Sequence, residues 1–171
     1  VWHALEDAAI APELFDGTIG IFAGAAESSY WLQLAQHEQG LDNLNLAIFN
    51  AQDALCTRTA YHLDLRGPAV SVQNFCSTSA VAVYLAITAL ERGECDLAIA
   101  GGVTIIIPER QGYLHRPGMI LSASGQCRAF DRNADGVVFS NGAGAVVLRP
   151  LSQAQAAGDR LVLVVVLLLA A

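Results

Sequence analysis

Apolar runs typical of buried strands alternate along this chain with segments whose apolar residues recur at helical spacing. Five runs predict strands, at residues 18–25, 67–75, 96–103, 142–151 and 161–169. Four segments predict helices, at residues 1–10, 50–63, 76–93 and 152–159. Short helices and loop are expected at 28–50, and a loop punctuated by glycine and proline at 107–136. Apolar strands that alternate with helices indicate an α/β domain with a parallel or mixed sheet, covered on both faces.

The segment CSTSAVAVYLAITALERG, residues 76–93, predicts a helix that is apolar on nearly every face and ends at Gly93. Such a helix is buried between the layers of a fold, and its burial also hides the unpaired N–H groups of its first turn. The hydroxyls of Ser77, Thr78 and Ser79 can satisfy some of these N–H groups. We therefore expect a buried central helix.

A lone cysteine, Cys76, stands where a strand-like run ends and this helix begins. The positive end of the helix dipole favours the thiolate there, which is the nucleophilic form. The N–H groups of the first turn can also hold the oxyanion of a tetrahedral intermediate. A buried structural thiol is the commoner role of a lone cysteine. The turn, the hydroxyl run and the apolar helix together favour a nucleophile at Cys76.

Composition excludes several classes of function. Hydrophobic residues make up 54% of the 171 positions and charged residues 15%, which suits one domain with a substantial core. The net charge is −7 and the nine basic residues are all arginine, which argues against nucleic acid and membrane surfaces as partners. The apolar tail at 161–171 has about half the length that a membrane-spanning helix needs.

The cysteines predict reduced thiols in a cytoplasmic protein: Cys56, Cys76, Cys95 and Cys127. None belongs to a CxxC pair and no histidine stands at zinc-finger spacing, so we expect no metal site. A disulfide framework is disfavoured in a chain of this size. We interpret Cys95 and Cys127 as packing residues. The DRNADG motif at 131–136 imitates the start of a calcium loop, but its twelfth position is Gly142 instead of glutamate.

The segment GPAVSVQNFCSTSAVAVYLAITALERGECDLAIAGGV resembles the active-site segment of β-ketoacyl synthases, especially the ketosynthase domains of modular polyketide synthases. The resemblance continues through GMILSASGQCRAFDRNADGVVFSNGAGAVVLRPLSQAQAAGD and reaches back to WHALEDAAIAPELFDGTIGIFAG. It implies a thiolase-like layered fold, with a mixed five-stranded sheet and a buried central helix in each half. It also implies that residues 1–160 form most of the N-terminal half and that residues 161–171 begin a truncated C-terminal half.

The resemblance implies an acyltransferase of the 3-oxoacyl-carrier-protein synthase type. Cys76 would take an acyl chain from the phosphopantetheine thioester of an acyl carrier protein, with its own N–H as half of the oxyanion hole. A malonyl-type carrier-protein thioester would then lose CO₂, and the carbanion would attack the Cys76 thioester. The family also implies a homodimer, with the strand at 67–75 near the two-fold axis, and no bound cofactor.

The family uses two histidines and a lysine that lie in motifs of its second half, and those motifs do not occur here. The chain has no lysine, and its histidines stand in other contexts: His3, His37, His62 and His115. We interpret His62 and His115 as solvated or structural. Both ends of the chain look cut. We therefore expect a fragment that can present the nucleophile but cannot complete a condensation alone.

Phe75 and Gln73 depart from the family pattern, which has a small residue just before the cysteine and an acidic residue three before it. Phe75 could narrow the acyl pocket or disturb the strand beside the dimer axis. Two other functions stay open. One is a non-catalytic scaffold that keeps the fold for dimerisation. The other, with less support, is a cysteine-dependent hydrolase, which needs a histidine base and an Asn or Asp to orient it.

The remaining motif residues have structural interpretations. Gly101 and Gly102 are expected to let their strand pass close to the Cys76 turn, because neither carries a side chain. Asp96 and Asp131 are expected to cap loops or turns.

Overall fold

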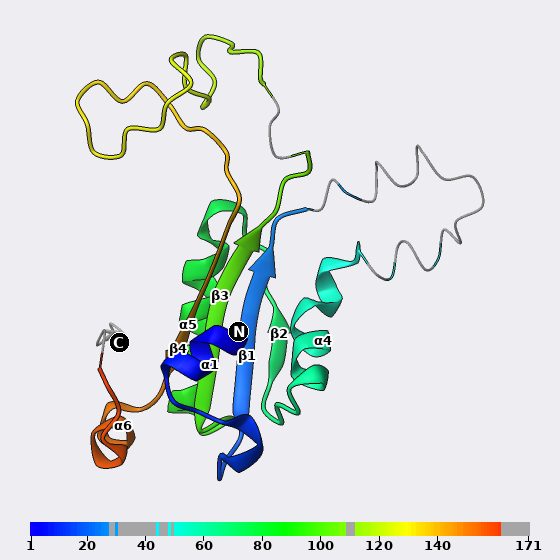
Figure 1. The fold of residues 1–171 in the computed structure, drawn as a ribbon, viewed down its shortest axis with the longest axis vertical. Coiled ribbons are helices and arrows are strands. Elements are labelled where there is room, and N and C mark those ends of the chain that lie inside the picture. Colours follow the sequence, from blue (N-terminus) through cyan, green and yellow to red (C-terminus); the bar gives the residue numbers. More distant parts are fainter. Residues whose placement is uncertain (28–29, 31–43, 45–47, 49, 109–111, 162–171) are drawn as a thin grey trace.

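One mixed sheet with helices on both faces organises the protein (Figure 1). The computed structural model describes residues 1–27, 30, 44, 48, 50–108 and 112–161. Four strands run side by side in the order β2-β1-β3-β4: β1 (Ile19–Ala25), β2 (Ala69–Ser71), β3 (Leu97–Thr104) and β4 (Gly142–Leu148). β1 is parallel to both β2 and β3, whereas β4 is antiparallel to β3. The predicted mixed α/β sheet is confirmed with four strands, and the strand predicted at 161–169 lies almost wholly outside the described residues.

The helices agree with the apolar pattern to within a few residues: α1 (Trp2–Asp7), α4 (Leu55–His62), α5 (Thr78–Glu91) and α6 (Leu151–Ala157). Three 3₁₀ turns accompany them: η1 (Pro12–Leu14), η2 (Gln52–Ala54) and η3 (Phe75–Ser77). Most of the predicted segment 28–50 lies outside the described residues. Within the part of the chain that is described, no helix is long and apolar enough to cross a bilayer.

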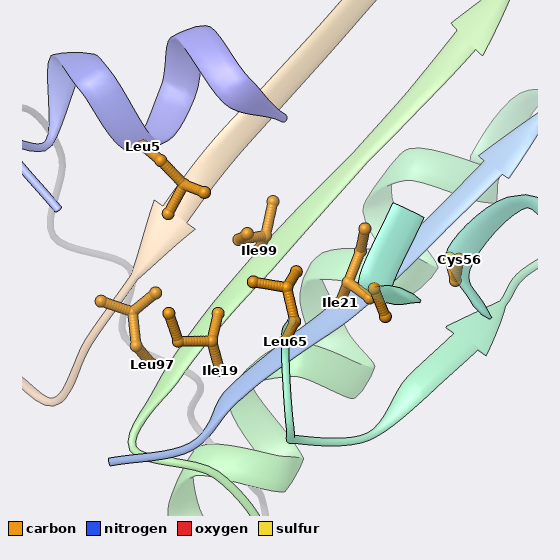
Figure 2. Packing of buried hydrophobic residues seen from close by; sticks show 8 residues of the cluster. Leu5, Ile19, Ile21, Cys56, Leu65, Leu97 and Ile99 are labelled. Carbon is orange, nitrogen blue, oxygen red and sulfur yellow. The ribbon is translucent and has the colours of Figure 1, made fainter. Parts of the chain in front are cut away.

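Alternate residues of β1 and β3 face opposite sides of the sheet, and each side has its own apolar cluster. The side that α1 and α4 cover holds four large strand residues, labelled near Leu65 in Figure 2: Ile19, Ile21, Leu97 and Ile99. The side that α5 covers holds Phe22, Ala98 and Ala100. The sheet is therefore the middle layer of three, as the sequence pattern predicts.

Helix α5 rests on the sheet through one side only. Ala82, Ala86 and Ala89 face the sheet and are each at most 3% exposed. Tyr84, which lies elsewhere on the helix surface, is 46% exposed. The predicted burial of this helix is thus seen on the side that faces the sheet, and the described residues supply a packing layer on just that side of α5. Its other side is apolar and only partly covered.

The chain between β3 and β4, residues 105–141, forms a long loop that we call the excursion. It starts and finishes at neighbouring points, beyond the carboxyl end of β3 (Figure 1). The Ile106 N–H donates to Asn141 Oδ1 at 2.6 Å across 35 residues. Inside the excursion, the buried Ser122 hydroxyl donates to Asp135 Oδ1 at 2.7 Å, and the Ser124 N–H donates to Asp135 Oδ2 at 2.8 Å. These hydrogen bonds, that from Ser122 above all, lower the pKa of Asp135 to about 2.

Acid is expected to loosen the excursion around Asp135. Because the pKa of Asp135 lies below its ordinary value of 3.8, the carboxylate stabilises the folded excursion above pH 3.8. That contribution is lost as the pH falls from 3.8 to about 2. The protection factor of the Ser124 amide in hydrogen exchange, followed from about pH 5 to about pH 2, should fall across this window.

Two variants separate this carboxylate from its neighbours. Asp135→Asn loses one acceptor oxygen, so the Ser124 amide should exchange readily at every pH. The matched control is Asp131→Asn. Asp131 accepts the Asn133 N–H at 2.7 Å, and asparagine keeps an oxygen for this bond. Protection of the Ser124 amide in this variant should therefore equal that in the natural chain. Constant protection of the Ser124 amide down to pH 2 would contradict the prediction.

The two acids predicted to cap turns do so. Asp96 Oδ2 accepts the Thr18 N–H at 2.8 Å and the Thr18 hydroxyl at 3.0 Å, which fixes the start of β1 beside the start of β3. The Thr18 N–H, first among these contacts, lowers the pKa of Asp96. Asp131 Oδ1 accepts the Asn133 N–H within its own turn.

Candidate active site

Cys76 lies in the turn that joins β2 to α5, and its side chain is exposed. Because β2 and β3 are both parallel to β1, the intervening chain must return along one face of the sheet, and it does so as α5. The first turn of α5 therefore lies near the carboxyl ends of β1 and β3, where their arrowheads point in Figure 1. The sequence prediction that Cys76 stands at a strand-to-helix turn is confirmed.

A hollow of about 810 Å³ opens beside this cysteine, and we call it the Cys76 hollow. Its wall consists of the carboxyl ends of β1 and β3, the first residues of β4 and the turn itself. Gln52, Gln73 and Glu27 add polar groups to the wall. In open α/β sheets, ligands bind beyond the carboxyl ends of the strands, and sites of roughly 300–1,000 Å³ hold small molecules. A substrate can therefore reach the Cys76 thiol here.

The backbone just before Cys76 is strained. Phe75 has φ +48°, a left-handed conformation that costs a residue with a Cβ about 1–2 kcal/mol. Its ring is fully exposed and forms part of the wall of the Cys76 hollow. Strain of this kind persists only where neighbouring contacts hold it, and it is common at functional sites. Phe75, which departs from the family pattern, thus lies next to Cys76 in the wall of the Cys76 hollow.

The hydroxyls after Cys76 do not cap α5 in the predicted way, and no side chain caps the N-terminus of this helix. They reach back to the loop before the cysteine. The Ser77 hydroxyl donates to the Asn74 carbonyl at 3.0 Å, and the Asn74 N–H donates to Thr78 Oγ1 at 2.8 Å. The Ser77 N–H also donates to the Asn74 carbonyl, at 3.1 Å. The Cys76 N–H precedes this first backbone hydrogen bond of the turn.

Glycines let the strands pass close to the Cys76 turn, but the closest approach is at Gly24 instead of the predicted Gly101 and Gly102. A Cβ on Gly102 would stand 3.6 Å from the Ser79 Cβ, an ordinary contact, and a Cβ on Gly101 would collide with the Gly144 carbonyl of β4 instead. Gly24 at the end of β1 is the glycine that lies closest to the turn, because a Cβ there would overlap the Val72 carbonyl and Thr78 Cγ2.

The four thiols fall into two groups. Cys56 and Cys95 are buried, and burial raises the pKa of both thiols, which disfavours their thiolates. The predicted packing role of Cys95 is confirmed. Cys127 is exposed in the excursion outside both apolar clusters, so its predicted packing role is wrong. Cys76 is the one thiol of the four that is both exposed and part of the wall of the Cys76 hollow.

None of the described histidines lines the Cys76 hollow. His62 ends α4 and makes an edge-on ring contact with Tyr61, and His115 Nδ1 lies 3.1 Å from the Leu121 carbonyl oxygen. His3 lies in α1, and His37 is outside the described residues. In the ranges that the structure covers, no group of three His, Cys, Asp or Glu side chains is placed to hold a metal ion. The described part of the site therefore supplies a thiol and N–H donors.

Comparison with known families and proteins agrees with this geometry. The family model described as "Beta-ketoacyl synthase, N-terminal domain" matches residues 1–154. The chain is 48% identical over 170 residues to a phenolphthiocerol/phthiocerol polyketide synthase of Mycobacterium tuberculosis. It is 38% identical over 159 residues to a polyketide synthase of Burkholderia thailandensis. These alignments cover 94% and 92% of this chain but only 11% and 3% of those relatives.

Solved structures give the same result for the fold. Ketosynthase twelve of the bacillaene polyketide synthase from Bacillus amyloliquefaciens superimposes with a TM-score of 0.82 at 29% identity. The match covers 93% of this chain and 28% of that chain. The ketosynthase from module 1 of the bacillaene synthase, from the same species, gives a TM-score of 0.76 at 30% identity. The predicted thiolase-like fold of a ketosynthase is therefore confirmed, for a chain that spans about a quarter of such structures.

Proposed function

The chain belongs to the β-ketoacyl synthase family, and from that premise we propose that it forms the nucleophile-bearing part of a polyketide synthase ketosynthase domain. The observation that carries the proposal is the exposed Cys76 thiol, which stands at the N-terminal end of α5 in the wall of the Cys76 hollow. The reaction is acyl transfer to Cys76 followed by decarboxylative Claisen condensation. Its finer type is that of a 3-oxoacyl-carrier-protein synthase.

In the first half-reaction, the Cys76 thiolate attacks the carbonyl carbon of an acyl chain held as a thioester on the phosphopantetheine of an acyl carrier protein. The Cys76 N–H donates a hydrogen bond to the oxyanion of the tetrahedral intermediate. The bond from the acyl carbon to the phosphopantetheine sulfur then breaks. The carrier thiol leaves with the proton that Cys76 gave up, and the acyl chain stays on Cys76 as a new thioester.

In the second half-reaction, a malonyl-type carrier-protein thioester loses CO₂, and the electron pair of the broken carbon–carbon bond attacks the Cys76 thioester. Cys76 leaves as the thiolate, and the product is a β-ketoacyl thioester two backbone carbons longer. No described residue in the wall of the Cys76 hollow is a histidine. We therefore assign to the described residues the nucleophile and one oxyanion donor, and to other parts of the enzyme the groups that assist decarboxylation.

The proposal is tested on the full-length protein that contains this chain, supplied with acyl and malonyl thioesters of its carrier protein. We expect an acyl adduct on the tryptic peptide 67–92, which contains Cys76, and then release of CO₂ with the β-ketoacyl thioester. Release of free acyl acid in place of the β-keto product would identify a cysteine-dependent hydrolase. Absence of any adduct on this peptide would identify a non-catalytic scaffold. Either result contradicts the proposal.

We also propose that the full-length protein is a homodimer with residues 67–75 near its two-fold axis. β2, which forms part of this segment, is a short strand at the edge of the described sheet, and Val70 within it is 39% exposed. An edge strand offers backbone N–H and C=O groups that a second chain can pair with. Sedimentation equilibrium should give twice the mass of one full-length chain. A single-chain mass at micromolar concentration would contradict the proposal.

We likewise propose how the chain divides between the two halves of the ketosynthase domain. Residues 1–160 are assigned to the N-terminal half of the ketosynthase domain, and residues 161–171 to the start of the C-terminal half. Residues 162–171 lie outside the described residues.

A further inference from the structure

A single hydroxyl joins the two residues that precede Cys76. Thr78 Oγ1 accepts the Asn74 N–H at 2.8 Å and donates its own hydrogen to the Phe75 carbonyl at 2.8 Å. The Phe75 carbonyl also accepts the Thr78 backbone N–H. The Thr78 hydroxyl thus uses its one hydrogen and one of its lone pairs on neighbouring peptide groups of the same loop.

The Phe75 carbonyl belongs to the peptide group that also carries the Cys76 N–H. In a planar trans peptide, the C=O and N–H bonds point in opposite directions. The bonds from Thr78 that fix the Phe75 oxygen therefore also fix the direction of the Cys76 N–H. The same bonds hold Phe75 at its left-handed φ of +48°, a conformation that an unrestrained phenylalanine would leave.

The methyl group of Thr78 has a separate contact. Its Cγ2 lies against Gly24 at the carboxyl end of β1, so closely that a Cβ on Gly24 would overlap it. Gly24 therefore gives Thr78 the room to stand at the start of α5 with its hydroxyl turned to the loop. The methyl group contacts the sheet, whereas the hydroxyl contacts the nucleophile loop, so the two functions can be separated by substitution.

We propose that Thr78 is a positioning residue for Cys76: its hydroxyl sets the orientation of the Phe75–Cys76 peptide and so places both the Cys76 thiol and the Cys76 N–H toward the hollow. The catalytic meaning of this role rests on the proposed function of Cys76. The placement of the thiol does not, because it can be measured without an acyl substrate.

The test is the rate at which iodoacetamide alkylates Cys76 in the full-length protein, divided by the rate at the exposed Cys127 of the same chain. Thr78→Val keeps the shape of the side chain and removes the hydroxyl, and it should lower this ratio roughly 10-fold or more, as misplaced reacting groups do. Thr78→Ser keeps the hydroxyl and removes the methyl group. It should restore the ratio to within about threefold of the natural chain, since one retained hydrogen-bonding group carries the effect.

The matched control is Thr88→Val in the same helix. The Thr88 hydroxyl donates to the Tyr84 carbonyl at 2.9 Å, a bond of the same kind that lies far from the cysteine loop, and its loss should leave the ratio unchanged. Equal ratios for Thr78→Val and Thr88→Val overturn the proposal. An equal loss in Thr78→Ser and Thr78→Val also overturns it, because the retained hydroxyl would then be unable to hold the loop by itself.

Alkylation of the buried Cys56 and Cys95 shows whether Thr78→Val has lost its fold. If the variant is unfolded, hydrogen exchange of the natural protein is measured instead. The Asn74 amide, which donates to Thr78 Oγ1, should be protected from exchange. Exchange at the rate of an unbonded amide overturns the proposal. The proposed function fails separately, when the natural protein makes no β-keto product. The alkylation ratio is unaffected by that result.

Discussion

Replacing Cys76 with alanine in the full-length protein is expected to lower the rate of β-ketoacyl product formation by at least roughly 1,000-fold, since covalent catalysis depends wholly on its nucleophile. Alanine leaves the backbone N–H donors in place, so carrier-protein binding should persist while the acyl adduct on peptide 67–92 disappears. The measurement is steady-state formation of the β-ketoacyl thioester, with intact-peptide mass spectrometry for the adduct.

The matched control is Cys127→Ser, which removes the second exposed thiol of the chain without touching the Cys76 hollow. It should leave product formation unchanged. Acylation or alkylation that falls mainly on Cys127, Cys56 or Cys95 in the natural protein would show that Cys76 has been wrongly assigned.

Replacing Ile21 with alanine is expected to destabilise the domain by about 2–5 kcal/mol, as truncation of a large core residue does. Ile21 lies in β1 at the middle of the sheet, is 1% exposed, and stands among the side chains that α1 and α4 cover (Figure 2). Alanine would leave a cavity on which the neighbouring strands cannot close, since β1 is paired on both edges. The melting temperature of the domain that contains this chain should fall accordingly.

Ile105→Ala is the matched control, because Ile105 is the same residue type, lies just after β3, and is 58% exposed. Its effect should remain within about 0.5 kcal/mol, as for other surface substitutions. Thermal melting of the two full-length variants is monitored by proteolysis of this domain. The melting temperatures of the two variants are then compared. Equal melting temperatures for Ile21→Ala and Ile105→Ala would show that the cluster under α1 and α4 does not limit stability.

Local patterns were sufficient for the elements and for the position of Cys76. The apolar runs predicted all four described strands, and the boundary between strand and helix placed Cys76 in the turn before α5, whereas its role as nucleophile stays a proposal. The partner of the Thr78 hydroxyl was not predictable, because it depends on the left-handed backbone of Phe75, which the sequence does not reveal for a residue other than glycine. Gly24 was missed for a different reason: its neighbour Thr78 is distant in sequence, and only the packing of β1 against α5 brings them together.

Exposure was the least predictable property. Cys127 looks like a packing residue in its sequence context, yet it lies in an excursion whose interior is organised by Ser122 and Asp135 instead of an apolar cluster. For α5, an all-round apolar sequence states what the helix can bury. It does not indicate which side of the helix packs against another element. Within the described residues, only the side that carries the buried alanines packs against the sheet.

The central position of β1 has a consequence for synthesis of the chain. Its parallel partner β3 arrives late: Thr18 and Asp96, which join the starts of the two strands, are 78 residues apart. At a translation rate of about 5–20 residues per second, β1 is therefore synthesised several seconds before β3 is available to pair with it. Neither face of the sheet can close in that interval, and the Cys76 turn has no rigid platform to rest on. The loop around Cys76 thus acquires its shape only after the segment that follows it in sequence has emerged, so the Cys76 hollow is expected to form late in folding.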